Sequence, residues 1–279
     1  MDEPRLFFGV GSGRCGTMTL ANLLNAEPGV VAMHEGKFRV FEEAGQQVLP
    51  FLTLQNYQAY RNPGSAISLF EKTRSGMEQI GRDHGALYFG DVAYNYAPFL
   101  GAIINRFPQA KLIFIYRDGR DFVRSAYTNS LPDPTPVGWP GADRTLSKVE
   151  RFVGLGRLRP VSVDPVNLEW DELSPVAKNA WLWAETNRII LRGLKRWPRD
   201  QVFHIRFETF FADLKGNYQA LRAFMGFDWQ MPADFSRFFS RKINKRKEKV
   251  LSHWSAWDDA TKEDFNRFGA DVMETLGYY

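Results

Sequence analysis

Short apolar runs recur along the chain, punctuated by glycine and separated by longer stretches with helical spacing. This alternation is typical of an α/β fold, in which crossover helices join parallel strands. Strands are predicted near five segments: Leu6–Val10, Val30–Met33, Leu87–Phe89, Leu112–Tyr116 and Val202–Phe207. The pattern therefore predicts one α/β domain over residues 1–279, with a central parallel sheet of about five strands flanked by helices.

Capping residues and glycines mark the predicted helix ends. The first helix starts in the loop after Gly11 and ends before Pro28. Ser174 is the predicted cap of a long helix that has Pro175 in its first position and stops at Pro198. Two more helices are predicted: Asp213–Met225, ending at Gly226, and a last one that opens with a capping box at Thr261–Asp264 and ends at Gly277.

Residues 131–175 break this pattern, because proline and glycine are scattered among isolated apolar residues. Irregular segments of this length in compact domains tend to be lids or binding loops. We therefore expect this insertion to lie on the side of the acceptor substrate.

Composition changes the picture only slightly. With 44% hydrophobic and 24% charged residues, the 279-residue chain resembles an ordinary globular protein, which argues against disorder. The single cysteine, Cys15, allows no intrachain disulfide, and no apolar run approaches the roughly 20 residues of a membrane span. Together these features predict a cytoplasmic protein without a membrane span.

The net charge of +4 is unevenly distributed. Arg237–Lys249 carries seven basic residues and one acid, so the rest of the chain is slightly acidic. A nucleic-acid-binding protein spreads its basic surface more widely. The charge pattern therefore favours a local anion site and argues against nucleic acid as a partner.

The glycine-rich segment Gly11–Thr17 connects the first predicted strand to the first helix. In this arrangement backbone N–H groups and a helix N-terminus converge on a phosphate. Gly11 and Gly16 have the spacing of a Walker motif, but the lysine of that motif is absent before Met18, and Met18 cannot ligate magnesium. The loop thus predicts a phosphate site and weakens the case for a P-loop kinase.

A second strand-to-helix junction carries an arginine at the strand end. Arg117 follows the apolar run Leu112–Tyr116, and Ser125 lies about two turns into the next helix. A guanidinium forms paired, charge-assisted hydrogen bonds with phosphate oxygens. This junction predicts a second anion site.

These two segments resemble the phosphate-binding motifs of sulfotransferases that use 3′-phosphoadenosine 5′-phosphosulfate (PAPS). The first motif, (P/G)-(K/R)-S-G-T-T, is matched by Gly13-Arg14-Cys15-Gly16-Thr17-Met18, and R-D-P-R-D…S is matched by Arg117–Asp121 with Ser125. Weaker similarities are the segments Phe203–Glu208, Asn244–Arg246 and His253-Trp254. The resemblance implies sulfuryl transfer from PAPS as co-substrate, without a metal.

The resemblance also implies roles for single residues. Arg14 would hold the 5′-phosphosulfate, and Arg117 with Ser125 would bind the 3′-phosphate. Lys245 and Arg246 would belong to a basic segment that folds back over that phosphate. Glu35, at the end of the second strand, resembles the glutamate base of tyrosylprotein-type sulfotransferases.

Neighbouring residues leave some choices open. His34 also has a suitable pKa for a base, but adjacent strand residues point to opposite faces, so only His34 or Glu35 should face the site. Phe207, Trp181 and Trp183 are candidates for adenine stacking, although such aromatic residues are more often core.

The sequence departs from the family pattern at two places. Gly119 replaces the usual proline, and Gly90–Ala93 lacks a lysine that many relatives carry near the transferred group. Two alternatives to a sulfotransferase stay open: a P-loop kinase or related phosphotransferase, and a non-catalytic nucleotide-binding module. The acceptor is expected to be a hydroxyl of a small molecule, lipid or glycan, and the oligomeric state is open.

Overall fold

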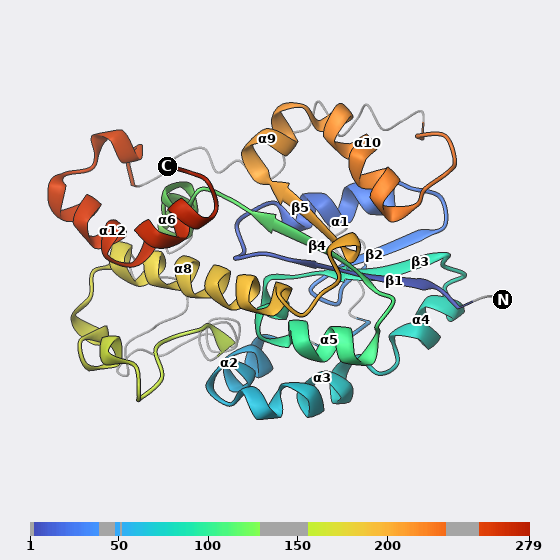
Figure 1. Ribbon diagram of the computed structural model, residues 1–279, viewed down its shortest axis with the longest axis horizontal. Helices are drawn as coiled ribbons and strands as arrows, with labels where there is room; N and C mark the ends of the chain where they lie inside the picture. The colour runs from blue at the N-terminus through green and yellow to red at the C-terminus, as the bar shows by residue number, and fades with distance from the viewer. Residues whose placement is uncertain (1–2, 39–47, 51, 129–155, 233–250) are drawn as a thin grey trace.

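A five-stranded parallel sheet forms the centre of the protein (Figure 1). The computed structural model describes residues 3–38, 48–50, 52–128, 156–232 and 251–279. The strand order is β2–β3–β1–β4–β5. The strands are β1 (Arg5–Val10), β2 (Val30–His34), β3 (Tyr88–Val92), β4 (Lys111–Tyr116) and β5 (Val202–Arg206). All five predicted strands are present, and the expected α/β fold is confirmed.

The position of each strand explains its composition. In β1, residues 6–10 are all buried, and β3 is buried throughout, because both strands have neighbours on either side and helices on both faces. Such central strands read as continuous apolar runs. The edge strand β5 is more exposed. It ends at Arg206, one residue before the predicted end, because Phe207 already starts a helix.

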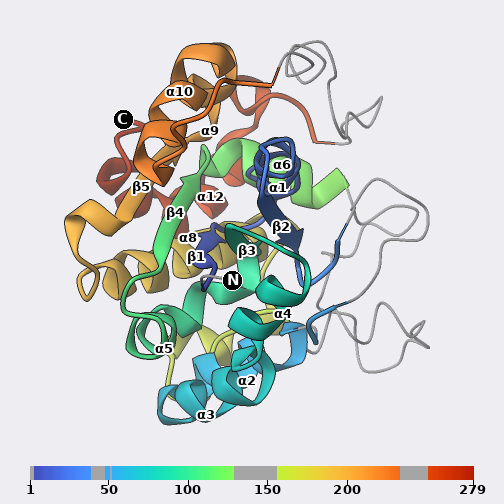
Figure 2. The ribbon, with the colours of Figure 1, turned by 90° about the vertical axis from the view of Figure 1, so that its right-hand side faces the viewer.

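Helices cover both faces of the sheet (Figures 1 and 2). On one face lie α1 (Thr17–Asn25), α9 (Phe207–Ala212) and α10 (Leu214–Met225). On the other face lie α2 (Thr53–Arg61), α3 (Ala66–Arg74), α4 (Met77–Asp83), α5 (Leu100–Arg106) and α8 (Pro175–Leu194). α6 (Gly119–Thr128) and α12 (Asp259–Thr275) lie toward the carboxyl ends of the strands.

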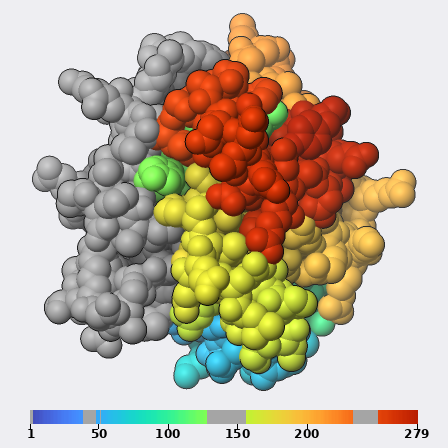
Figure 3. Space-filling view, turned by 90° about the vertical axis from the view of Figure 1, so that its left-hand side faces the viewer, coloured from blue at the N-terminus to red at the C-terminus, as the bar shows by residue number. Residues whose placement is uncertain are grey.

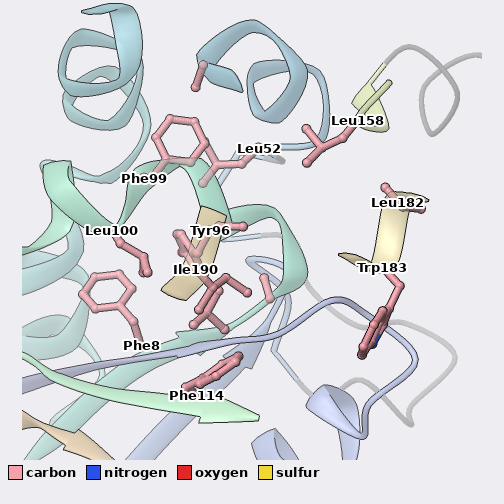
Figure 4. Close-up of a cluster of buried hydrophobic side chains, with 14 of the residues drawn as sticks. Phe8, Leu52, Tyr96, Phe99, Leu100, Phe114, Leu158, Leu182, Trp183 and Ile190 are labelled. Carbon is pink, nitrogen blue, oxygen red and sulfur yellow. The ribbon is translucent and has the colours of Figure 1, made fainter. Parts of the chain in front are cut away.

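The larger apolar core lies between the sheet and the second group of helices (Figure 4). Phe8 from β1 makes an edge-on ring contact with Tyr96, at 5.3 Å between centroids. Phe114 from β4 and Trp183 from α8 are fully buried in the same cluster. This core fixes α8 beneath the sheet. Helix α12 packs against α8 and forms part of the surface seen in Figure 3, where it is red. Arg188 of α8 and Asp271 of α12 are joined by a 2.7 Å ion pair.

Most predicted helix ends are confirmed. The Ser174 hydroxyl accepts a hydrogen bond from the Ala177 amide at 3.1 Å, and Gly226 ends α10 in the left-handed conformation. The predicted capping box at Thr261–Asp264 is wrong. Asp258 caps α12 instead, its carboxylate accepting from the Thr261 amide at 2.8 Å. A carboxylate at the cap position is favoured as strongly as a hydroxyl, so helix α12 begins earlier.

The order of the strands determines where the site lies. The chain visits β2 and β3 on one side of β1, and then β4 and β5 on the other. In open α/β sheets, ligands bind at the carboxyl ends of the strands where the strand order reverses. Here that position is the loop that follows β1.

Candidate active site

The loop between β1 and α1 has a backbone that few residues adopt easily. Gly13, Arg14 and Gly16 all have positive φ angles, of 81°, 53° and 91°. Because Arg14 is not glycine, its left-handed conformation is strained, and such strain gathers at functional sites. Helix α1 has no acidic residue in its first turn and no side chain capping its described N-terminus. A helix N-terminus with these features favours a bound anion.

Two glycines of this loop are required by packing. A Cβ on Gly11 would lie 2.3 Å from the Ile115 carbonyl oxygen, and one on Gly16 would lie 3.0 Å from the Phe207 ring. Cys15 is fully buried, and burial raises the pKa of its thiol to about 11. The Cys15 side chain therefore serves the packing of the loop rather than any thiolate chemistry.

The two predicted anion segments meet. A guanidinium N–H of Arg117 donates to the main-chain oxygen of Arg14 at 3.0 Å. In return, Nε of Arg14 donates to the Ser125 hydroxyl at 3.1 Å. Thus Arg14 lies beside Arg117 and Ser125, which follow it by 103 and 111 residues in sequence, and all three line one edge of the sheet. Arg117 also donates to Asp121 at 3.2 Å and lies 4.6 Å from the Phe207 ring centroid.

Two residues from distant elements hold the Arg117 loop in place. The Glu208 carboxylate accepts from the Asp118 amide at 3.0 Å and from the Tyr278 hydroxyl at 2.8 Å. The Trp183 indole N–H donates to the Arg117 carbonyl at 3.1 Å. Sequence reasoning missed both roles, because it considered Glu208 only within a strand-like motif and Trp183 only as a core or stacking residue. Trp183 is fully buried, so the structure does not expose it for stacking.

The glycine in place of the family's proline has a packing cause. A Cβ on Gly119 would lie 2.8 Å from the Trp183 ring, closer than real Cβ contacts come. The indole that bonds to the Arg117 carbonyl therefore occupies the space that a side chain at position 119 would need. Gly119 and Trp183 form a matched pair.

Glu35 lies in a tight turn rather than at the end of the strand. His34 and Lys37 exchange two backbone hydrogen bonds, of 3.0 and 3.1 Å, around Glu35 and Gly36. Both central residues have positive φ, 53° and 77°, as in a type I′ turn. The strand-alternation argument for choosing between His34 and Glu35 was therefore wrong, because only His34 belongs to β2.

The two residues have different surroundings. His34 Nε2 is 3.1 Å from the Thr17 hydroxyl, and burial lowers the pKa of His34 to about 4. His34 is therefore neutral at pH 7 and supports the phosphate loop. Burial, with a contribution from Asp91, raises the pKa of Glu35 to about 7, although Lys37 and Arg157 act in the opposite direction. A carboxyl group with a pKa near neutrality is suited to proton transfer.

A buried polar network anchors the Glu35 turn. One oxygen of Asp91 accepts from the Gly36 amide at 3.1 Å, and the other accepts from the Tyr96 hydroxyl at 2.7 Å. Arg74 donates to the Tyr96 hydroxyl at 2.8 Å and lies 3.7 Å from the same carboxylate. Asp91 lies in the stretch where many relatives carry a lysine, and a carboxylate cannot replace that cation.

Some predictions fall outside what the structure describes. Lys245 and Arg246 lie outside the described residues, as do residues 131–155 of the irregular insertion.

Within the described ranges, no three His, Cys, Asp or Glu side chains gather as a metal site would need. Among the same residues no helix combines the length and apolar character that a bilayer crossing demands.

Comparisons with known proteins point in one direction. Residues 4–139 match the model of the sulfotransferase family. The fold is similar to the sulfotransferase domain from the curacin biosynthetic pathway, with a TM-score of 0.55, 15% identity, and 100% and 99% of the two chains covered. It is also similar to sulfotransferase STF9 from Mycobacterium avium, with a TM-score of 0.51, 12% identity, and 99% and 77% covered. A third similar structure is the sulfotransferase domain of the Synechococcus PCC 7002 olefin synthase, with a TM-score of 0.50, 15% identity, and 100% and 97% of the two chains covered. None of the curated proteins matches this sequence.

Proposed function

We propose that this chain, whose residues 4–139 match the sulfotransferase family model and whose fold is that of solved sulfotransferases, transfers a sulfuryl group from PAPS to a hydroxyl acceptor. The family and the fold indicate sulfuryl transfer in general. The donor and the residues that act on it are the finer part of the proposal.

The single observation that carries the proposal is the joining of the two anion segments. PAPS bears anionic groups on the 5′ and 3′ sides of one ribose, so its binding needs two anion sites within the reach of one nucleotide. The bonds from Arg117 to the Arg14 carbonyl and from Arg14 to the Ser125 hydroxyl make the two segments neighbours. A kinase would need only the first site, with the lysine and magnesium ligand that this loop lacks.

In the proposed reaction, the acceptor oxygen bonds to sulfur while the bond from sulfur to the bridging phosphate oxygen breaks. Glu35 takes the proton of the acceptor hydroxyl. The products are a sulfate ester and adenosine 3′,5′-bisphosphate (PAP). Arg14 would hold the 5′-phosphosulfate and balance the charge of the departing phosphate, and Arg117 with Ser125 would hold the 3′-phosphate.

Other parts of the proposal rest on the sequence. Gly13, Cys15, Gly16, Thr17 and Met18 would offer loop and helix N–H groups to the 5′ side. Lys245 and Arg246 stay predictions for the 3′ side, as do a cytoplasmic location, independence of metal, and a small-molecule, lipid or glycan acceptor.

A thermal-shift comparison tests the donor site. PAP at 100 times its dissociation constant should stabilise the protein by about 2.7 kcal/mol, with or without EDTA. Arg117→Ala should abolish this stabilisation. The matched control is Arg106→Ala, a partly buried arginine paired with Glu78 that closes α5, at the opposite edge of the sheet from Arg117.

Two results would contradict the proposal. Stabilisation by ATP with magnesium, but not by PAP, would favour the phosphotransferase alternative. Tight PAP binding without turnover of PAPS against a panel of phenolic, lipid and glycan hydroxyls, with affinity unchanged in Glu35→Gln, would favour the non-catalytic module.

A further inference from the structure

The short segment 156–158 enters the site from the irregular insertion and is held at both ends. The Gly156 carbonyl accepts a hydrogen bond from the Asn56 side chain at 3.0 Å. Leu158 is 2% exposed and belongs to the main core. A Cβ on Gly156 would lie 1.7 Å from the Thr53 carbonyl oxygen, so the backbone is pressed against the start of α2. Arg157 is therefore held between two fixed neighbours.

A continuous line of contacts runs from this segment to the phosphate loop. Thr53, on which Gly156 packs, forms a side-chain hydrogen bond with Tyr94. Tyr94 begins the short helix η2 (Tyr94–Phe99) just after β3. Its Cβ would be 3.5 Å from a Cβ on Gly13, which is ordinary van der Waals contact. The insertion thus reaches the loop through Thr53 and Tyr94.

The side chain of Arg157 is partly buried. The titratable groups that act on it are Tyr94, Arg14 and Glu35, which come from three different segments of the chain. Burial and Arg14 lower the pKa of Arg157, whereas Tyr94 and Glu35 raise it, so Arg157 lies within electrostatic reach of both Arg14 and Glu35. A ligand anion placed between the two guanidinium groups would relieve their mutual repulsion. Glu35 is the proposed base, so this anion position lies between the base and the 5′ side of the donor site.

We propose that Arg157 binds the sulfuryl group that is transferred, and so supplies the cation that the stretch Gly90–Ala93 lacks. This inference rests on the proposed function. Negative charge on the sulfuryl oxygens and on the bridging oxygen must be balanced as the sulfur–oxygen bond breaks, and a fixed guanidinium beside the base can do this. Arg157 is then a catalytic residue contributed by the insertion rather than by the sheet.

PAPS and PAP differ only by the sulfuryl group, so comparing their affinities isolates the proposed contact between Arg157 and that group. The experiment measures the dissociation constants of both for the full chain and for Arg157→Met, which keeps an unbranched apolar side chain. PAPS should bind about 10- to 100-fold more weakly to the variant, as expected for loss of a charged hydrogen bond, while PAP binding changes less than about twofold. Arg157→Lys should recover part of the PAPS affinity.

The matched control is Arg159→Met. Arg159 lies two residues along, is exposed, and stacks on the Tyr57 ring at 4.7 Å, so its loss should leave both dissociation constants unchanged. Retained PAP binding by Arg157→Met also reports that the variant is folded.

Equal loss of PAP and PAPS affinity in Arg157→Met would overturn the inference, because Arg157 would then act on the bisphosphate or on the loop. Unchanged affinity for both would overturn it as well. Failure of the parent protein to bind either nucleotide would instead overturn the proposed function, so the two failures are distinguishable.

Discussion

Replacing Glu35 by glutamine should stabilise the protein above pH 7. Burial and Asp91 raise the pKa of Glu35 from 4.5 to about 7, so the folded protein disfavours the carboxylate form that the proposed role as a base requires. Below pH 4.5 the carboxyl is protonated in both the folded and unfolded states. Between 4.5 and 7 the folded state binds more protons, so stability falls as the pH rises. Glutamine removes this loss and retains the side-chain length.

The magnitude follows from the size of the shift. Each pH unit between 4.5 and 7 should add about 1.4 kcal/mol to the difference in unfolding free energy between Glu35→Gln and the parent, which levels off at roughly 3 kcal/mol. For a domain of this size that corresponds to a melting temperature higher by on the order of 5–10 °C. His34 complicates the parent curve, because its lowered pKa makes stability rise with pH between about 4 and 6.5. The difference between the two proteins cancels that contribution.

Urea unfolding followed by tryptophan fluorescence, from pH 5.5 to 8.5, measures this difference. Glu263→Gln serves as the control, because it removes an exposed carboxylate from α12 and should give a flat difference. A flat difference for Glu35→Gln as well would refute the reasoning, since the Glu35 carboxyl would then not be buried in the folded state. A difference that falls with pH would show that Lys37 and Arg157 outweigh burial.

Two further predictions test the packing around the site. Gly119→Ala places a Cβ 2.8 Å from the Trp183 ring, so it should destabilise the fold by about 1–3 kcal/mol and weaken PAP binding by moving the Arg117 loop. An unchanged melting temperature and an unchanged PAP affinity would contradict the pairing of Gly119 with Trp183. Glu27→Gln weakens a buried ion pair with Arg222 at 2.8 Å, far from the site, and should cost about 3–5 kcal/mol in urea unfolding. PAP affinity should not change in Glu27→Gln, and a loss of affinity would mean that the site depends on this distant pair.

Much of the site could be predicted from local sequence patterns. The glycine-rich loop after β1 and the arginine after β4 each combine a buried strand, a tight turn and a helix start, which are local features. Because the carboxyl ends of parallel strands meet at one edge of a sheet, even the joining of Arg14 and Arg117 could be expected. The approximate limits of all five strands also followed from their apolar runs.

The remaining features depend on contacts between segments far apart in the chain. The conformation of Glu35 and its raised pKa come from burial and from Asp91, 56 residues later, which is adjacent only because β2 and β3 are neighbours. The need for glycine at position 119 comes from the adjacent Trp183 ring, and the proposed role of Arg157 comes from its electrostatic neighbours Arg14 and Glu35. The sequence by itself identified the candidate anion-binding groups, because charge and backbone freedom are properties of single residues and short turns. The tertiary structure alone decided how these groups are desolvated and paired, because desolvation and pairing arise from packing between distant segments.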